Sequence, residues 1–176
     1  GLIQYYQNDG ICNYINQTGT ANPFDDIDVG RFSTPQFVDF DKDGDLDLIS
    51  GGEEGIIHYY RNDGNSGYVQ LIGLANPFLG IDSGIESSPQ LVDFDGDSDL
   101  DLITGNFLGE VQYYRNEGNN TFSRPIGTAN PFNIANVGFR SIPQLIDFDG
   151  DSDLDLIVGG ENGSISYYEN KPTCLP

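Results

Sequence analysis

The chain has 176 residues, of which 37% are hydrophobic and 12% aromatic, and its formal net charge at pH 7 is −21. This length allows one good core or a short array of repeats. So acidic a surface repels nucleic acids and anionic membranes, which excludes both as partners, and no apolar stretch is long enough to insert into a membrane. The chain carries neither an initiator methionine nor a signal peptide, so we expect a mature or excised segment.

A period of 54 residues runs through the chain without insertions. Tyr-Tyr pairs, each followed by Xaa-Asn, stand at 5–6, 59–60, 113–114 and 167–168. Ala-Asn-Pro-Phe recurs at 21–24, 75–78 and 129–132, and Pro-Gln opens an apolar run at 35, 89 and 143. We therefore divide this single repeat domain into a partial repeat at 1–34, repeats at 35–88 and 89–142, and a partial repeat at 143–176.

The first partial repeat is predicted to hold a third and a fourth strand, at residues 1–6 and 13–19, and then a connector. The complete pattern is clearest in the middle copy, where strands are predicted at about 89–94, 100–104, 110–115 and 121–126, before a connector at 129–141. The last partial repeat supplies a first, a second and a third strand. No stretch shows sustained helical periodicity, and four antiparallel strands are the content of one propeller blade. The expected fold is all-β, an array of four-stranded propeller-type blades in three 54-residue repeats with incomplete terminal blades.

An acidic loop separates the first two predicted strands of each repeat. It carries aspartate at every second position, and the three copies contain Asp39, Asp41, Asp43, Asp45 and Asp47; Asp93, Asp95, Asp97, Asp99 and Asp101; and Asp147, Asp149, Asp151, Asp153 and Asp155. Like charges this close repel one another, so a cation is expected among them. A solvated, disordered run would be the alternative for an acidic stretch, but apolar residues bracket all three copies in the same phase.

The spacing suits calcium. Carboxylates at loop positions 1, 3, 5 and 9, with a backbone carbonyl from position 7, can form the oxygen cage that a hard divalent cation requires. Gly44 stands at position 6 of the first loop, where a positive φ costs little, whereas Ser98 and Ser152 stand there in the others and predict slightly strained turns. An EF-hand would need a glutamate at position 12 and flanking helices, and both are missing. Magnesium fits less well because it resists dehydration. We predict one structural Ca²⁺ per loop, three in all.

The pattern Asp-x-Asp-x-Asp-Gly-x-x-Asp-Leu, followed by a glycine, resembles the FG-GAP repeat, also called the VCBS-type repeat. The resemblance covers essentially the whole chain. It implies propeller blades that bind calcium between their first two strands, through the five aspartates of each loop. The family occurs in integrin α-chain heads, fungal lectins and secreted surface proteins. Such propellers usually close with about seven blades, whereas three repeats are present here.

The incomplete ends predict association, since an exposed strand edge is normally covered. Cys12 and Cys174 lie three full periods apart and hold the same place in the repeat. A disulfide between them would imply ring closure or a folded-back tail within one chain, or a staple between the tail of one subunit and the head of the next. Two unpaired thiols are the alternative.

Asn-x-Ser/Thr sequons occur at Asn16, Asn119 and Asn162. Calcium loops, glycosylation signals and cysteines all point to a secreted or cell-surface location. No nucleophile elbow, phosphate loop or zinc spacing is present, and no acidic pair outside the loops recurs as glycosidase carboxylates would, so no catalytic site is predicted. His58 is expected to be an exposed structural residue.

One tyrosine of each pair, such as Tyr59 or Tyr113, is expected in the core, and its neighbour is expected to face outward. The phenylalanine of each Asn-Pro-Phe is expected to fill the space between blades. The leading hypothesis is an extracellular structural or adhesion protein that assembles head to tail into a closed oligomer or an open fibre. The alternative is a lectin-like module that binds glycans or extracellular proteins, and a third possibility is a scaffold segment of a larger multidomain enzyme.

Overall fold

A computed structural model describes residues 1–64 and 67–171, and within them it contains strands and short 3-10 turns but no α-helix. The strands of the first part are β1 (Tyr5–Asn8), β2 (Tyr14–Gln17), β3 (Thr34–Val38), β4 (Asp47–Gly51), β5 (His58–Asn62) and β6 (Tyr68–Leu71). Those of the second part are β7 (Ser88–Val92), β8 (Asp101–Gly105), β9 (Val111–Asn116), β10 (Phe122–Ser123), β11 (Ile142–Ile146), β12 (Asp155–Gly159) and β13 (Ile165–Tyr168). The all-β prediction is confirmed.

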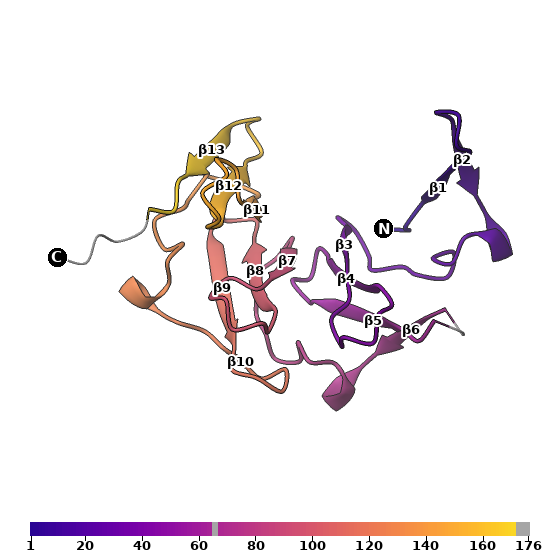
Figure 1. Cartoon of the computed structure of the whole chain (residues 1–176), viewed down its shortest axis with the longest axis horizontal. Helices are drawn as coiled ribbons and strands as arrows, with labels where there is room; N and C mark the ends of the chain where they lie inside the picture. The colour runs from indigo at the N-terminus through magenta and orange to yellow at the C-terminus, as the bar shows by residue number, and fades with distance from the viewer. Residues whose placement is uncertain (65–66, 172–176) are drawn as a thin grey trace.

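The strands form antiparallel sheets in simple chain order. β3-β4-β5-β6 and β7-β8-β9-β10 are four-stranded, β11-β12-β13 is three-stranded and β1-β2 is two-stranded. The four sheets follow one another along an open arc, with β1-β2 at one end and β11-β12-β13 at the other (Figure 1). The first strands line its inner side, where β7 contacts both β3 and β11. The four-stranded unit predicted from the sequence is therefore present, while a closed propeller is not.

Successive sheets approach closely at their inner edge, and a glycine makes this possible. A Cβ added to Gly51 at the end of β4 would lie 2.1 Å from the carbonyl oxygen of Ser87, and one added to Gly105 would lie 2.0 Å from that of Ser141. Real atoms do not approach so closely, so only glycine fits at these two positions. The glycine that ends the second strand after the first and second acidic loops thus serves the contact between sheets, whereas its counterpart Gly159 has no neighbour within 4 Å.

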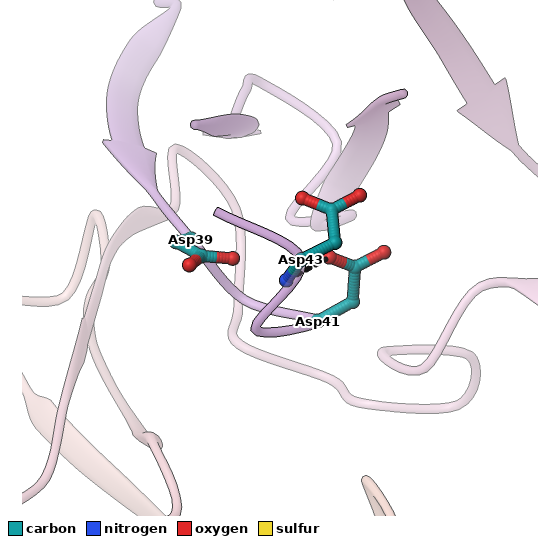
Figure 2. A group of neighbouring side chains, drawn as sticks. All are labelled: Asp39, Asp41 and Asp43. Atoms are coloured by element: carbon teal, nitrogen blue, oxygen red, sulfur yellow. Dashed lines mark hydrogen bonds between the residues drawn. The ribbon is translucent and has the colours of Figure 1, made fainter. Parts of the chain in front are cut away.

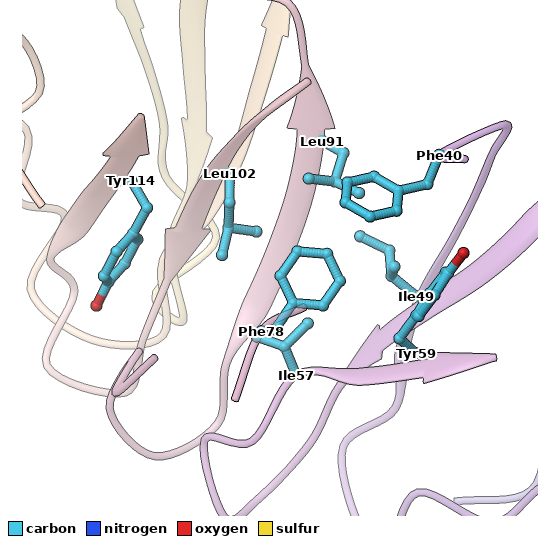
Figure 3. Packing of buried hydrophobic residues seen from close by; sticks show 8 residues of the cluster. All are labelled: Phe40, Ile49, Ile57, Tyr59, Phe78, Leu91, Leu102 and Tyr114. Atoms are coloured by element: carbon cyan, nitrogen blue, oxygen red, sulfur yellow. The ribbon is translucent and has the colours of Figure 1, made fainter. Parts of the chain in front are cut away.

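The hydrophobic core lies between the sheets. In the cluster between the second and third sheets, Phe40, Ile49 and Tyr59 face Leu91, Leu102 and Tyr114 (Figure 3). Phe78, from the Asn-Pro-Phe connector, is 3% exposed and contacts the rings of Phe40, Tyr59 and Phe122, which belong to both sheets. Phe24 and Phe132 are also buried in such clusters. The predicted role of this phenylalanine, to fill the space between sheets, is confirmed.

In both complete sheets the prediction for the tyrosine pairs is confirmed for the first tyrosine, which is buried, and wrong for its neighbour, which is buried as well. Tyr59 and Tyr60 are 2% and 5% exposed, and Tyr113 and Tyr114 are both 5% exposed. Neighbouring sheets cover both faces of these strands, so the tyrosine that points away from one core enters the next. Among the described residues, the exposed tyrosines lie in the terminal sheets, where Tyr6, Tyr14 and Tyr167 are 48%, 69% and 46% exposed.

Several strand bounds also differ from the prediction. β10 contains two residues rather than six, and Pro125 follows shortly after it; proline cannot donate a ladder hydrogen bond. β1 begins at Tyr5 rather than at the first residue. The connectors include 3-10 turns at Gly19–Ala21, Gly73–Ala75 and Gly127–Ala129. Among the described residues, no helix has the length and apolar character needed to cross a bilayer.

Candidate calcium sites

Each acidic loop joins the first strand of a sheet to the second: β3 to β4, β7 to β8, and β11 to β12. The strands on both sides of the loop are firmly placed, because they pair along their whole length, from Thr34↔Gly51 to Val38↔Asp47 in the second sheet, β3-β4-β5-β6. The loop must therefore turn within a few residues, and its carboxylates converge.

The structure brings together the aspartates at loop positions 1, 3 and 5. In each triad the candidate ligand atoms lie within 4.8 Å of one another, and the triads are Asp39, Asp41 and Asp43; Asp93, Asp95 and Asp97; and Asp147, Asp149 and Asp151. Figure 2 shows the first triad on its loop, with its carboxylates on the same side of the turn. Calcium ligation by these residues remains a prediction.

Backbone N–H groups orient the carboxylates. Asp39 accepts a bond from the N–H of Gly44 at 3.1 Å, and Asp93 and Asp147 accept the corresponding bonds from Ser98 and Ser152 at 3.0 and 3.2 Å. In each loop the position-5 N–H donates to the position-3 carboxylate, and the position-7 N–H donates to the position-5 carboxylate. The loop is thus folded around its own side chains.

Two residues of every loop have positive φ, at positions 4 and 6. In the first loop these are Lys42 at 62° and Gly44 at 98°. In the second they are Gly96 at 78° and Ser98 at 73°, and the third repeats this arrangement with glycine and then serine. Each loop therefore places glycine at one of the two positions and a strained residue at the other. The strain expected at Ser98 and Ser152 is present, and Lys42 has it in the first loop.

The position-9 aspartates differ from the rest because they are fully buried. Asp47 is 0% exposed and accepts hydrogen bonds from the Tyr59 hydroxyl at 2.8 Å, the Asn62 N–H at 2.8 Å and the Phe40 N–H at 3.3 Å. Asp101 and Asp155 bind Tyr113 and Tyr167 in the same way, each at 3.0 Å. Burial raises the pKa of Asp101, against the lowering effect of its hydrogen bonds. These aspartates therefore tie the loop and the second strand to the third strand.

This tyrosine contact is a site feature that the sequence analysis did not anticipate. The signal was available, because the first tyrosine of every pair stands twelve residues after the position-9 aspartate. Burial, followed by the bond to Asp155, raises the pKa of Tyr167 to about 12, so its hydroxyl stays protonated as a donor at neutral pH.

The position-7 aspartates lie outside the triads. The sequence predicts that the backbone carbonyl of this position, rather than its carboxylate, completes the oxygen cage. Their side chains have different surroundings. Asp99 forms a 3.0 Å ion pair with Lys42 of the preceding loop. The Lys42 ammonium also donates a 2.9 Å hydrogen bond to the carbonyl of Ser98. The pKa of the Asp153 carboxyl is raised, first by burial and then by the negative charge of Asp151. Lys42 thus links the first two loops.

Counter-charges also distinguish the three loops. The Arg115 guanidinium on β9 lies 2.9 Å from the Asp95 carboxylate and 3.9 Å from that of Asp97. It therefore neutralises part of the negative charge of the second triad. The corresponding residue of the last sheet, β11-β12-β13, is Glu169, which adds negative charge. Burial is the first cause of the raised pKa of Asp41, and the Asp47 and Asp43 carboxylates add to it. An uncompensated excess of negative charge is therefore present at these loops.

The donor set fits a hard divalent cation. One carboxylate oxygen of Asp39 and one of Asp153 are buried without a hydrogen-bond partner, which leaves acceptors that a cation would satisfy. The three triads consist only of carboxylates, the ligand type that calcium prefers. When bound, such an ion would supply charge neutralisation and a rigid link between loop segments.

The other predicted modification sites lie on the surface where they are described. Asn16 on β2, Asn119 before β10 and Asn162 before β13 are exposed. Cys12 is exposed and has no disulfide partner among the described residues. Cys174 lies outside those residues, so the proposed pairing stays a prediction. His58 is partly buried beside Gln70, which lies 3.3 Å from its Nδ1.

Comparisons with known proteins agree with this repeat geometry. The model of the FG-GAP-like repeat matches residues 39–104 and 93–158, each match beginning at the first aspartate of a loop. The chain belongs to the FG-GAP-like repeat family. Together the two matches extend over most of the chain and include all three acidic loops.

A human relative, cartilage acidic protein 1, is 25% identical over 162 residues, which are 87% of this chain and 23% of that protein. The chain thus spans less than a quarter of the relative's length. A solved structure from Agrocybe aegerita, described as the basis of specific recognition of non-reducing terminal N-acetylglucosamine by a lectin, is similar at 24% identity with a TM-score of 0.49. That likeness covers 92% of this chain and 42% of the lectin chain.

Proposed function

We propose that this FG-GAP-like chain is an extracellular structural or adhesion module that calcium stabilises and that associates with copies of itself. The observation that carries the proposal is that the same carboxylate triad occurs three times, each time in the loop between the first two strands of a sheet. The match to the FG-GAP-like repeat, which the sequence analysis associates with integrin heads, lectins and surface proteins, supports a binding or structural role.

The calcium ion would act structurally. It would bind the triad between the first two strands, while the position-9 aspartate holds the third strand through its tyrosine. Three divalent ions would offset six of the chain's 21 net negative charges. The free energy of ion binding adds to the free energy of folding, because the unfolded chain has no preformed site.

An extracellular location follows from the same features. Calcium is available there at concentrations that saturate modest sites, and all three sequon asparagines are exposed. The name of the human relative, cartilage acidic protein 1, supports an extracellular location. Self-association is supported by the apolar surface of the terminal sheets, where Phe148 and Ile165 are 65% and 78% exposed.

Calcium titration by calorimetry tests the proposal. We expect about three calcium ions per chain and an increase in melting temperature, with little effect of equal magnesium. Light scattering in calcium without reductant should report a mass above the 19.2 kDa of one chain. A calcium-insensitive monomer would contradict the proposal. Loss of the larger mass with reductant alone would support the interchain disulfide between Cys12 and Cys174.

The alternative function is a lectin-like binding module. A groove of about 540 Å³ lies between the second and third sheets and is lined by Asp82, Tyr114, Asn120 and Arg124, among others. These polar side chains could bind sugar hydroxyls. A glycan-array screen in calcium tests this alternative, and Arg124→Ala should abolish any binding that uses this groove. Tight binding by a chain that remains monomeric would favour the lectin over the structural module.

A further inference from the structure

The last sheet of the chain exposes a face that both preceding sheets bury. We define the open face as Ile146, Phe148, Ile157, Ile165 and Tyr167. Phe148, Ile165 and Tyr167 are 65%, 78% and 46% exposed, whereas their counterparts in the second sheet, Phe40, Ile57 and Tyr59, are 5%, 1% and 2% exposed. The same apolar side chains that form a core within the molecule are therefore left in contact with water.

The two internal junctions show how this face binds a neighbour. Besides the apolar cluster, the glutamine of each Pro-Gln reaches the main chain of the next first strand. Gln36 donates to the Leu91 carbonyl at 3.1 Å and accepts from the Leu91 N–H at 2.7 Å, and Gln90 makes the same pair with Leu145 at 3.2 and 2.7 Å. Gln144 holds the third such position and is exposed.

The other end of the chain has the complementary shape. Phe37, the counterpart of Leu91 and Leu145, is 40% exposed, whereas these leucines are 3% and 5% exposed. Tyr5 on β1 meets Phe24 edge to face at 6.1 Å, as Tyr59 meets Phe78 at 6.0 Å. β1 and β2 therefore occupy the places of a third and a fourth strand. Among the described strands, nothing occupies the places of the first and second.

We propose that a second copy of this chain covers Ile146, Phe148 and Ile157 of the open face, and that its β1-β2 hairpin takes the place of β13 and completes the sheet begun by β11 and β12. This extends the self-association in the proposed function to a defined contact. Gln144 would pair with the main chain of the second copy's Phe37, and Phe148 would pack against its Tyr5 and Phe24. The contact repeats, group for group, the two junctions already present within the chain.

Both β1 and β13 are third strands, so one must replace the other on β12. The two carry the same signature, Tyr-Tyr-Gln-Asn in β1 and Tyr-Tyr-Glu-Asn at β13. In the single chain Asp155 accepts bonds from the Tyr167 hydroxyl at 3.0 Å and the Asn170 N–H at 2.8 Å. Tyr5 and Asn8 offer the same two groups at the same spacing. β1 of the second copy thus takes the place of β13, as in strand exchange between identical subunits.

The number of sheets selects the dimer. Each chain supplies three pairs of first and second strands, β3-β4, β7-β8 and β11-β12. Closed propellers contain about four to eight blades. One chain supplies too few and three chains too many, whereas two chains supply a number within this range. For this 176-residue segment, the association that fits the range is therefore a closed ring of two copies rather than a fibre.

Light scattering in calcium tests the contact. The wild-type chain should have twice the 19.2 kDa chain mass. Phe148→Asp and Phe37→Asp should each halve this mass, whereas Leu74→Asp, at a connector position that is 98% exposed, should leave it unchanged. Thermal unfolding of Phe148→Asp verifies that it folds, since the residue is already exposed in the single chain. A wild-type monomer, a polymer, or a dimer that survives Phe148→Asp would each overturn the inference.

A disulfide trap tests the strand exchange. Val158 pairs with Ser166 across β12 and β13, so the exchange would pair Val158 with Gln4 of the second copy. In a Cys12→Ser, Cys174→Ser background, Gln4→Cys with Val158→Cys should give a covalent dimer on oxidation, and neither substitution alone should. Absence of that dimer in a chain of doubled mass would overturn the inference while leaving calcium binding and self-association intact.

Discussion

At the scale of the residue, the loops of this chain combine two kinds of aspartate. Asp39, Asp41 and Asp43 converge where an ion can reach them, whereas Asp47 is fully buried and satisfied by protein donors. The first kind supplies the charge that a cation neutralises. The second kind holds the loop to the third strand, because a buried carboxylate requires the hydrogen bonds that this strand donates.

Replacing Tyr113 with phenylalanine tests whether the buried aspartates stabilise the fold through their tyrosine hydrogen bonds. The change removes the hydroxyl that donates to buried Asp101 at 3.0 Å, so the free energy of unfolding should fall by about 1–3 kcal/mol. Urea unfolding in calcium measures the loss. Tyr6→Phe is the matched control, because Tyr6 is 48% exposed, and it should have almost no effect. Equal stability of the two variants would refute the structural role of the tyrosine bond.

Replacing Arg115 with glutamine tests whether the aspartates of a triad bind calcium through their negative charge. The Arg115 guanidinium lies 2.9 Å from Asp95 and competes with a cation for the second triad. Because this pair is partly exposed, its removal should strengthen calcium binding at the second loop by no more than about fivefold. Calorimetry measures the change. Arg124→Gln, which removes an arginine that lies over Tyr114, should leave calcium affinity unchanged. Weaker binding in Arg115→Gln would contradict the prediction.

At the scale of the element, each connector joins two sheets covalently and through its phenylalanine. Phe78 lies 5.3 Å from the ring of Phe40 and 5.4 Å from that of Phe122, one on each side of the junction. A two-stranded hairpin has little stability alone, and even a four-stranded sheet here buries its faces only against its neighbours. Stability is therefore shared between adjacent sheets, as in repeat proteins.

Replacing Phe78 with alanine should consequently loosen two sheets together. The cavity and the lost apolar burial should cost about 3–5 kcal/mol. Hydrogen exchange should show faster exchange in both β5 and β9, whereas Leu74→Ala, at a fully solvated position, should change neither strand. Faster exchange confined to β5 would show that the junction does not couple the two sheets.

At the scale of the whole molecule, the excess of negative charge destabilises the folded state, because the acidic residues repel one another. The net charge is −21, and 15 of the 28 acidic residues lie in the three loops. Repulsion within each loop falls when an ion binds and also, less effectively, when salt screens it. The stability of the whole array should therefore depend on both calcium and ionic strength.

Removal of calcium with a chelator should lower the melting temperature by several degrees, and about 1 M sodium chloride should restore part of the loss, since the screening length there is about 3 Å. At one hundred times the dissociation constant, each ion would contribute about 2.7 kcal/mol. Differential scanning fluorimetry across a salt series measures both effects. No response to the chelator, or full restoration by salt alone, would contradict a specific calcium role.

The sequence by itself determined the period, the strand content and the convergence of the first three aspartates of each loop. These features are local: alternation defines a strand, and a short loop between paired strands brings its own side chains together. The tertiary structure decided the rest. It placed both tyrosines of each internal pair in a core, because burial depends on which neighbour covers each face of a sheet. It also made Gly51 and Gly105 essential, and it exposed Phe148 and Phe37 at opposite ends of the arc, since packing between sheets is a long-range property that no single repeat contains.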